Sequence, residues 1–214
     1  MNSRGYFISL EGGEGAGKTT LMNGLIEWIK SQNIPLLVTR EPGGTPVSEK
    51  LRDLVLHGDY ITPEAELLMV FAARAQHVET VIRPALAKGT WVLSDRFVDA
   101  SFAYQGAGRK LPIDWIEDLQ HRVVGETMPD RTILLDISVE LGQTRIGARG
   151  ELDRMEKSGL DFMQRVRKQY LSRAKEQPQR FTLIDASQSA EQVLDLAIQS
   201  INPEFRKSLS STNK

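Results

Sequence analysis

The 214-residue sequence has no cysteine, which removes disulfides, thiolate metal ligands and a thiol nucleophile. It also has no apolar run near the ~20 residues that a membrane helix needs, and Met1 leads into a strand-like segment rather than a signal-peptide apolar region. Neither sign of charge dominates, because 27 Lys and Arg face 28 Asp and Glu. We therefore expect a cytoplasmic protein without nucleic-acid or membrane partners, in which anions are bound by local arginine clusters.

Residues 12–19 read Gly-Gly-Glu-Gly-Ala-Gly-Lys-Thr and fit the phosphate-binding pattern G-x-x-x-x-G-K-[ST]. An apolar run precedes them and a helical repeat follows, and this context argues against a chance match in a glycine-rich turn. Glycines let backbone N–H groups converge on a phosphate chain. Lys18 would add positive charge there, and Thr19 would place a hydroxyl on Mg²⁺. The predicted triphosphate-binding residues are Gly12, Gly13, Glu14, Gly15, Ala16, Gly17, Lys18 and Thr19.

Apolar runs and helical repeats alternate along the chain. The runs that predict strands are residues 6–10, 36–38, 91–95, 132–136 and 181–185. The repeats that predict helices are residues 18–31, 46–56, 63–86, 114–124, 139–146, 160–175 and 190–201. Residues 104–109 are expected to form a polar, glycine-bearing loop, and the tail at 202–214 is expected to fray. A chain of 214 residues fits one domain, which we expect over residues 1–214. Because the strands are continuously apolar, we expect a three-layer, doubly wound α/β fold around a five-stranded parallel sheet.

Ligands of such sheets bind outside the carboxyl ends of the strands. The predicted strands place Arg40, Asp95 and the glycine-rich loop at that edge. Asp95 would hold Mg²⁺, directly or through water, although an N-cap or loop aspartate is the alternative. Arg96 beside it would bind a second phosphate group, because a planar guanidinium can hold two oxygens.

Two further groups of residues have competing interpretations. Phe71 and Arg74 share one face of a predicted helix, where a core aromatic beside an arginine is the commoner arrangement. Arg145, Arg149 and Arg154 form a dense charge run that is typical of a solvated helix end. The glycines within it would also suit a mobile lid over residues 147–155, whose arginines would neutralise charge in phosphoryl transfer.

Five motifs occur together, at residues 11–20, 39–44, 95–96, 103–106 and 150–154. With them the chain resembles the bacterial thymidylate kinases, P-loop nucleoside monophosphate kinases that use ATP and Mg²⁺ to convert dTMP to dTDP for dTTP biosynthesis. The resemblance also implies a homodimer. No arginine stands within the glycine-rich loop here, which matches the class in which lid arginines act in catalysis, Arg149 first and Arg145 or Arg154 after it.

The resemblance implies roles for matching residues. Phe71 would stack on thymine, Arg74 would bond to the edge of the base, and Tyr104 would sit under the deoxyribose. The implied dTMP-binding set is Glu14, Arg40, Arg52, Phe71, Arg74, Arg96, Ser101, Tyr104 and Gln105. The implied catalytic set is Lys18, Asp95, Arg96 and Arg149, and the implied metal-binding set is Thr19 and Asp95. Arg145 and the turn at 185–187 would meet adenine.

Two alternatives stay open. One is a kinase of the same fold that acts on dUMP, dCMP or a deoxynucleoside. The other is a GTPase-like switch or a nucleotide-binding regulator. The sequence lacks the Asn-Lys-x-Asp guanine motif after a strand, and it has a second set of arginines that a switch would not need.

Overall fold

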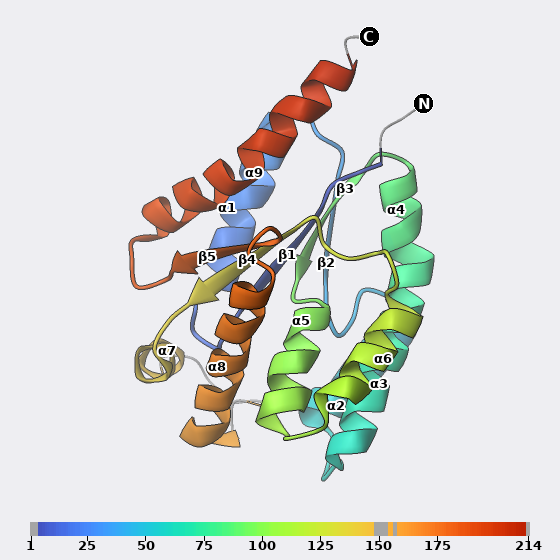
Figure 1. Ribbon diagram of the computed structural model, residues 1–214, viewed down its shortest axis with the longest axis vertical. Helices are drawn as coiled ribbons and strands as arrows, with labels where there is room; N and C mark the ends of the chain where they lie inside the picture. The colour runs from blue at the N-terminus through green and yellow to red at the C-terminus, as the bar shows by residue number, and fades with distance from the viewer. Residues whose placement is uncertain (1–3, 148–153, 156–157, 213–214) are drawn as a thin grey trace.

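The computed structural model describes residues 4–147, 154–155 and 158–212, with side chains described as far as Ile201. Five strands form one parallel sheet in the order β2-β3-β1-β4-β5 (Figure 1). The strands are β1 (Phe7–Gly12), β2 (Leu36–Arg40), β3 (Trp91–Asp95), β4 (Arg131–Asp136) and β5 (Phe181–Asp185). This confirms the predicted five-stranded doubly wound sheet and places β1, which leads into the glycine-rich loop, at its centre.

The two faces of the sheet pack against different helices. Ile8 and Leu10 of β1 share a buried cluster with α1 (Lys18–Ser31) and α9 (Ala190–Thr212). Phe7, one residue earlier, belongs to a second cluster formed with α3 (Pro63–His77) and α6 (Ile113–Val123). Successive strand residues point to opposite faces, so a central strand with apolar residues on both sides is what a sheet covered on both faces requires.

The remaining helical segments complete the layers, and Figure 1 shows most of them. They are α2 (Pro46–His57), η1 (Val78–Ile82), α4 (Arg83–Ala87), α5 (Val98–Ser101), η2 (Phe102–Gly108), α7 (Val139–Ile146) and α8 (Leu160–Glu176). The two predicted helix starts at proline are confirmed. Thr45 and Thr62 each accept a hydrogen bond from the backbone N–H three residues later, with proline in the first turn.

Three predictions of local structure need correction. The helix predicted over 63–86 continues to Ala87 but contains a π-helical turn, η1. The loop predicted over 104–109 is wrong, because residues 102–108 form the π-helical segment η2. Its glycines allow close packing rather than turning: a Cβ on Gly106 would lie 2.7 Å from Ile113 Cδ1, and one on Gly108 would lie 2.6 Å from Phe162 Cε2. The last helix continues beyond the predicted end at 201, to Thr212.

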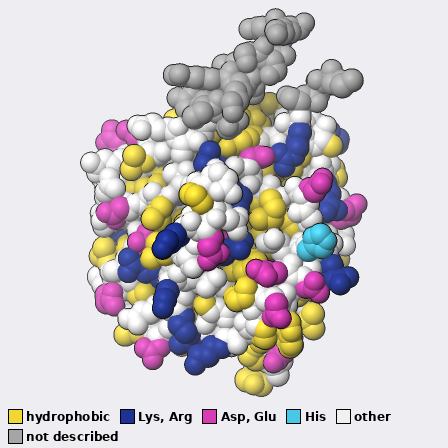
Figure 2. Space-filling model, viewed as in Figure 1, with side chains coloured by type: hydrophobic (Ala, Val, Ile, Leu, Met, Phe, Trp, Pro, Cys, Tyr) yellow, Lys and Arg dark blue, Asp and Glu magenta, His cyan; other side chains and the backbone are white. Residues whose placement is uncertain are grey.

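The surface in view carries both signs of charge, with Lys and Arg side chains mixed among Asp and Glu (Figure 2). This agrees with the formal net charge of -1. Among the helices of the described residues, none combines the length and the apolar character needed to cross a membrane.

Candidate active site

The glycine-rich loop between β1 and α1 has a backbone that only glycine tolerates at two points. Gly12 has φ 143° and Gly15 has φ 72°. A Cβ on Gly12 would lie 2.5 Å from the Leu135 carbonyl oxygen, and one on Gly15 would lie 2.2 Å from the Gly142 carbonyl oxygen. The loop therefore packs directly against backbone, which fixes its curl before any ligand binds.

Lys18 begins α1 and its side chain folds back over the loop. Its Nζ donates to the carbonyl oxygens of Gly12 and Gly13, each at 3.0 Å. Burial lowers the pKa of Lys18, and the positive charge of Arg96 lowers it further. The Lys18 ammonium can exchange these two neutral carbonyl partners for phosphate oxygens, which are negatively charged and therefore form stronger hydrogen bonds with it.

The carboxyl ends of β1, β2 and β3 meet beside this loop. Asp95 pairs in register with both Leu10 of β1 and Arg40 of β2. Its Oδ1 is buried and has no hydrogen-bond partner. Burying a carboxylate oxygen without a hydrogen-bond partner costs free energy of folding. Asp95 lines the same cavity as Thr19, and a cation bound there would give its oxygen a partner.

The described residues contain no group of three or more His, Cys, Asp or Glu side chains able to hold a metal. A cation at Asp95 and Thr19 would need further oxygen ligands from phosphate and water. This is the usual arrangement for Mg²⁺, which keeps several waters and binds through one or two protein groups together with substrate phosphates. The residues present therefore fit the predicted metal.

Arg96 follows β3 with a left-handed backbone, φ 66°. This conformation turns its side chain back toward the glycine-rich loop, where Nη1 donates to the Gly12 carbonyl oxygen at 3.0 Å and Nη2 pairs with Glu14. The guanidinium also covers the ring of Tyr104, with Cζ 4.8 Å from the centroid. Burial and neighbouring charges act in opposite directions, and the pKa of Arg96 stays well above its ordinary value.

Thirteen of the predicted residues line one cavity of about 200 Å³. They come from the glycine-rich loop, α2, α3, the end of β3 and the α5–η2 segment, so the fold joins residues that lie far apart in the sequence. They are Glu14, Gly15, Ala16, Gly17, Lys18, Thr19, Arg52, Arg74, Asp95, Arg96, Ser101, Tyr104 and Gln105. Arg40 lies outside this set; its guanidinium pairs with the exposed Glu49 at 2.8 Å.

Phe71 does not take the position predicted for it, facing the base. It is 2% exposed and belongs to the core, with the Arg74 guanidinium over its ring at 4.6 Å from Cζ to centroid. The residue of α3 that lines the cavity is Val70. Val70 and Arg74 are four residues apart and share a helix face, whereas Phe71 is rotated by about 100° toward the sheet.

Arg74 itself is almost fully enclosed, with 2% of the residue exposed. Its Nε donates to Glu41 Oε2 at 2.7 Å, and its Nη1 donates to Ser101 Oγ at 3.0 Å. Glu41 in turn bonds with His77 Nδ1 at 3.0 Å. A guanidinium has five N–H donors, so this network orients Arg74 and leaves donors for a ligand in the cavity.

Sequence reasoning missed a buried carboxylate on the same helix face. Glu66 lies one helical turn before Val70 and is fully buried. Its Oε1 accepts from Gln105 Nε2 at 2.7 Å, and its Oε2 accepts from Arg109 Nε at 3.1 Å and from Arg154 Nη2 at 2.5 Å. The spacing of Glu66, Val70 and Arg74 at every fourth residue was the signal available, because it puts two charged side chains on one stripe with an apolar one between them.

Arg145 and Arg154, at the two ends of the predicted arginine run, have different surroundings. Arg145 Nη1 donates to the Ala186 carbonyl oxygen at 3.0 Å, beside a second cavity of about 280 Å³ that the glycine-rich loop shares with the start of α9. Arg154 is held by Glu66 and by the Val55 carbonyl oxygen at 2.9 Å. Arg149 lies outside the described residues.

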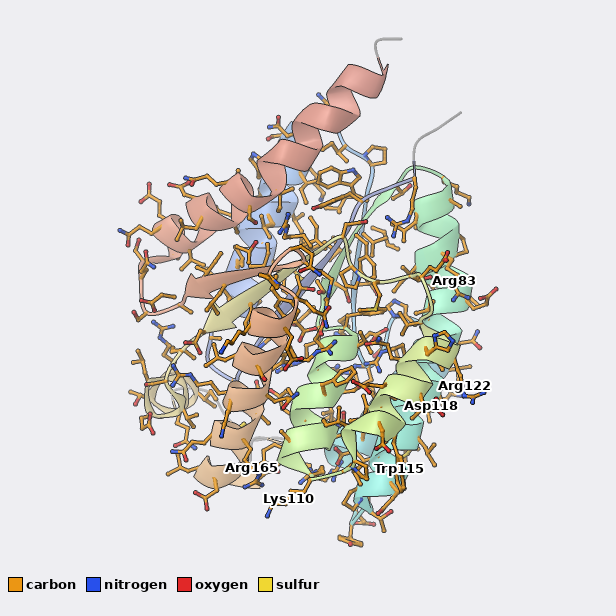
Figure 3. All side chains as sticks on the ribbon, in the orientation of Figure 1. Arg83, Lys110, Trp115, Asp118, Arg122 and Arg165 are labelled. Atoms are coloured by element: carbon orange, nitrogen blue, oxygen red, sulfur yellow. The ribbon has the colours of Figure 1, made fainter. Side chains whose placement is uncertain are left out.

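The helix that presents Gln105 is held from the neighbouring α8. Arg165 extends from α8 to the end of η2, where it donates to the carbonyl oxygens of Ala107 at 3.0 Å and Gly108 at 2.9 Å (Figure 3). These carbonyls end a helical segment and would otherwise lack partners. The contact closes η2 just after Gln105, which restricts the position of that side chain.

A family model, curated sequences and a solved structure that resemble this chain all carry the description thymidylate kinase. The family model described as thymidylate kinase matches residues 10–197. The chain is 50% identical over 192 residues to a thymidylate kinase of Marinomonas sp. (strain MWYL1), covering 89% of this chain and 91% of that protein. It is 51% identical over 191 residues to one of Ectopseudomonas mendocina (strain ymp), covering 88% and 91%. It also superposes on the crystal structure of a thymidylate kinase from Ehrlichia chaffeensis with a TM-score of 0.77 and 29% identity, covering 93% and 99%.

Proposed function

Because the chain belongs to the thymidylate kinase family and is an ATP-dependent dTMP kinase, we propose a division of labour among the residues of its cavity. The glycine-rich loop binds the phosphates of ATP, and the arginines opposite bind the phosphate of dTMP. The observation that carries this proposal is the shared cavity, in which Lys18 and Arg96 both face the same space. Two sets of anion-binding groups at one sheet edge are what transfer between two phosphate-bearing substrates requires.

On the donor side, the backbone of the loop and the start of α1 bind the triphosphate, and Lys18 moves from its two carbonyls to the phosphate oxygens. Thr19 and Asp95 would hold Mg²⁺, which would supply positive charge to offset the negative charge that develops during transfer. The cavity beside Arg145 and Ala186 receives the adenine ring. Its wall of loop backbone and small side chains leaves room for a flat base.

On the acceptor side, Arg96 and Arg52 bind the phosphate of dTMP. Arg52 lines the cavity and is kept in place by a 2.9 Å bond from Nη1 to the Pro42 carbonyl oxygen. Arg40 joins them by exchanging its exposed partner Glu49 for the phosphate, which is a small loss because exposed ion pairs contribute little. Glu14 and Tyr104, already bonded to each other at 2.9 Å, contact the sugar.

The base lies against the face of α3 that carries Glu66, Val70 and Arg74. Val70 supplies the apolar contact that was predicted for Phe71, and Arg74 donates a hydrogen bond to the edge of thymine. Ser101 and Gln105 border the same space from the facing α5–η2 segment. A small cavity with one apolar wall and a few fixed polar groups is the usual form of a base-binding site.

The acceptor phosphate is already an anion at neutral pH, so the reaction needs no strong general base. The task of the protein is to align the two phosphates and to balance their charge, which Lys18, Arg96 and Arg52 do from both sides. We propose that Arg149 adds a further positive charge from the lid, as the resemblance implies.

We also propose a homodimer and a cytoplasmic location. The dimer is supported by large apolar side chains that are exposed on one group of helices: Leu54 of α2 is 51% exposed, Leu68 of α3 is 60% exposed and Trp115 of α6 is 49% exposed (Figure 3 shows Trp115). Such residues are candidates for helix packing between subunits. Light scattering of the purified protein across a dilution series tests the dimer.

The decisive test of substrate is an acceptor screen with ATP. Release of ADP should be fast with dTMP, slower with dUMP, and near background with dCMP, with thymidine and without acceptor. Lys18→Ala serves as the inactive control and should keep the wild-type circular dichroism spectrum. Equal turnover without any acceptor would instead favour the nucleotide switch, and preference for thymidine would favour a nucleoside kinase.

A further inference from the structure

We propose that Glu66 is a specificity-determining residue that fixes the orientation of the Gln105 side-chain amide, so that the amide oxygen faces the base and accepts the N3–H of thymine. The inference rests on the proposed function, because it assumes that the base lies beside Gln105. It goes further by assigning the selection of bases with an N3–H group to a buried carboxylate that does not touch the substrate.

Glu66 offers Gln105 an oxygen that accepts hydrogen bonds. An ionised carboxylate accepts hydrogen bonds and cannot donate one. Here the group is fully buried, and its Oε2 accepts from two guanidinium groups, those of Arg109 and Arg154. Donors converge on both of its oxygens, Gln105 on Oε1 and the two guanidinium groups on Oε2, so the group is paired on both sides as an acceptor. Oε1 is therefore an obligate acceptor.

Glu66 decides which end of the Gln105 amide faces it. A glutamine amide has a donor end and an acceptor end that are usually distinguished only by their partners. Gln105 Nε2 lies 2.7 Å from Glu66 Oε1, and the opposite orientation would place two oxygens in contact. The nitrogen must face Glu66, so the oxygen faces away from it, toward the cavity that Gln105 lines.

Thymine and cytosine differ in the hydrogen-bonding groups that Arg74 and Gln105 would meet. Thymine presents an acceptor at O4 and a donor at N3, whereas cytosine presents a donor at N4 and an acceptor at N3. Arg74 can only donate, and Gln105 in this orientation can only accept at the cavity side. The pair matches thymine and uracil at both positions and opposes cytosine at both. Leaving a buried polar group without its partner gives strong discrimination between such substrates.

Glu66→Gln tests the proposal with almost no change of shape. The new amide oxygen can take the place of Oε2 and accept from Arg109 and Arg154, which leaves the new NH₂ group facing Gln105. Gln105 would then turn its oxygen to that NH₂ and its own NH₂ to the cavity. We expect kcat/KM for dTMP to fall by about 10-fold to 100-fold, as the loss of one buried bond implies.

The deciding quantity is the ratio of kcat/KM for dTMP to that for dCMP. We expect it to fall at least ~10-fold in Glu66→Gln, because dCMP loses a mismatch at N3 while dTMP gains one. The absolute rate with dCMP should stay low, since Arg74 still opposes N4. A merely structural role of Glu66 would lower both rates in parallel, and an unchanged ratio in a folded variant overturns the proposal.

Arg109→Gln is the matched control. It removes one of the two guanidinium groups from Glu66 but keeps the carboxylate that Gln105 faces. We expect a lower melting temperature and a dTMP to dCMP ratio equal to that of the wild type. A ratio that moves as far as in Glu66→Gln would show that loosening this region is sufficient, and would count against a role for amide orientation.

A second measurement needs no variant. In the proton NMR spectrum of the wild-type protein bound to ¹⁵N-labelled dTMP, the N3 imino proton should be visible and protected from exchange with water. An imino proton that exchanges as fast as in free dTMP overturns the proposal even if Glu66→Gln fails to fold. The acceptor screen distinguishes failure of the proposed function from failure of the role of Glu66. A wild-type protein without preference for dTMP rejects the proposed function. A wild-type protein that prefers dTMP, together with an unchanged dTMP to dCMP ratio in Glu66→Gln, rejects only the role of Glu66.

Discussion

The guanidinium of Arg96 lies over the ring of Tyr104, with Cζ 4.8 Å from the centroid, and both side chains meet the same carboxylate, that of Glu14. These residues come from the end of β3, from η2 and from the glycine-rich loop. A cation held by a ring face and a carboxylate has little freedom to reorient. Arg96 is thus held, without any ligand, at the edge proposed to bind phosphate, and this is the preorganisation that charge stabilisation in catalysis needs.

Arg96→Ala should lower kcat by about 10²-fold to 10³-fold, as the loss of one preorganised charged donor does in other enzymes. Alanine keeps a Cβ at the left-handed position, so the backbone conformation is equally strained in both proteins. Arg122→Ala is the control, because Arg122 is exposed on α6 and its ion pair with the exposed Asp118 is loose, at 3.6 Å (Figure 3). Steady-state rates with ATP and dTMP compare the two. Comparable activity in both variants would remove Arg96 from the reaction.

Asp95→Asn should raise the concentration of Mg²⁺ needed for half-maximal activity, with a smaller effect at saturating metal. The change keeps the size of the side chain while removing the charge that faces the cation, and Oδ1 is the buried oxygen without a partner. An equilibrium titration of Mg²⁺ in the presence of a non-hydrolysable ATP analogue gives a second readout. Identical metal curves for variant and wild type would show that Asp95 does not serve the ion.

Replacing Arg145, Arg149 or Arg154 by alanine should change different kinetic constants. Arg154 is tied to Glu66 and Val55, so Arg154→Ala should lower thermal stability and dTMP affinity more than kcat. For Arg149→Ala we expect the reverse, a large fall in kcat with little change in dTMP affinity. Arg145→Ala should mainly raise the KM for ATP, since Arg145 borders the cavity proposed for adenine. Equal effects of all three changes on kcat would contradict this assignment.

Asp99→Asn should lower the free energy of unfolding by roughly 3–5 kcal/mol, the usual loss when one member of a buried ion cluster is neutralised. Asp99 is fully buried and accepts from Arg173 at 2.9 Å and from Arg180 at 2.6 Å, joining α5, α8 and the start of β5. Asp53→Asn, in an exposed pair with His57, should change stability by less than ~0.5 kcal/mol. Urea denaturation measures both. A small effect at Asp99 would mean that the two arginines find other acceptors.

The sheet and most helix bounds could be predicted because their signals are local. The central strand is apolar on both faces, and Thr45 and Thr62 precede prolines at two helix starts. η2 could not be predicted in this way, since Gly106 and Gly108 suggest a turn until Ile113 and Phe162 are seen to pack against them. Its helical character depends on contacts that only the tertiary structure supplies.

Some residues of the candidate active site could likewise be placed from the sequence, and others could not. Residues tied to a motif or a strand end, such as Lys18 and Asp95, could be placed from sequence because the parallel sheet sends every strand end to one edge. Phe71 is buried in the core and Val70 lines the cavity, and sequence alone could not choose between them because both satisfy the spacing to Arg74. Glu66 was missed since a glutamate on a helix is usually solvated, and its burial follows from partners that are distant in sequence.

Glu11 gives a pH dependence of stability whose sign follows from its burial. Its carboxyl accepts from the Phe97 N–H and the Tyr170 hydroxyl, each at 2.7 Å. Burial, with a contribution from the charge of Asp99, raises the pKa of Glu11 from 4.5 to about 8. Between these values the folded protein keeps a proton that the unfolded chain releases. The free energy of unfolding should therefore decrease as pH rises through this window, by up to ~1.4 kcal/mol per pH unit from this residue.

Glu11→Gln isolates that contribution, because a neutral amide of the same shape cannot titrate. The difference in unfolding free energy between Glu11→Gln and the wild type should shift in favour of the variant from pH 5 to pH 8, and should level off above about 8, where the carboxyl is ionised in both states. Other ionisable groups cancel in this difference. Glu79→Gln, at a side chain that is 69% exposed, should give a nearly constant difference over the same range. Parallel pH curves for Glu11→Gln and the wild type would show that the buried carboxyl titrates as it does in the unfolded chain.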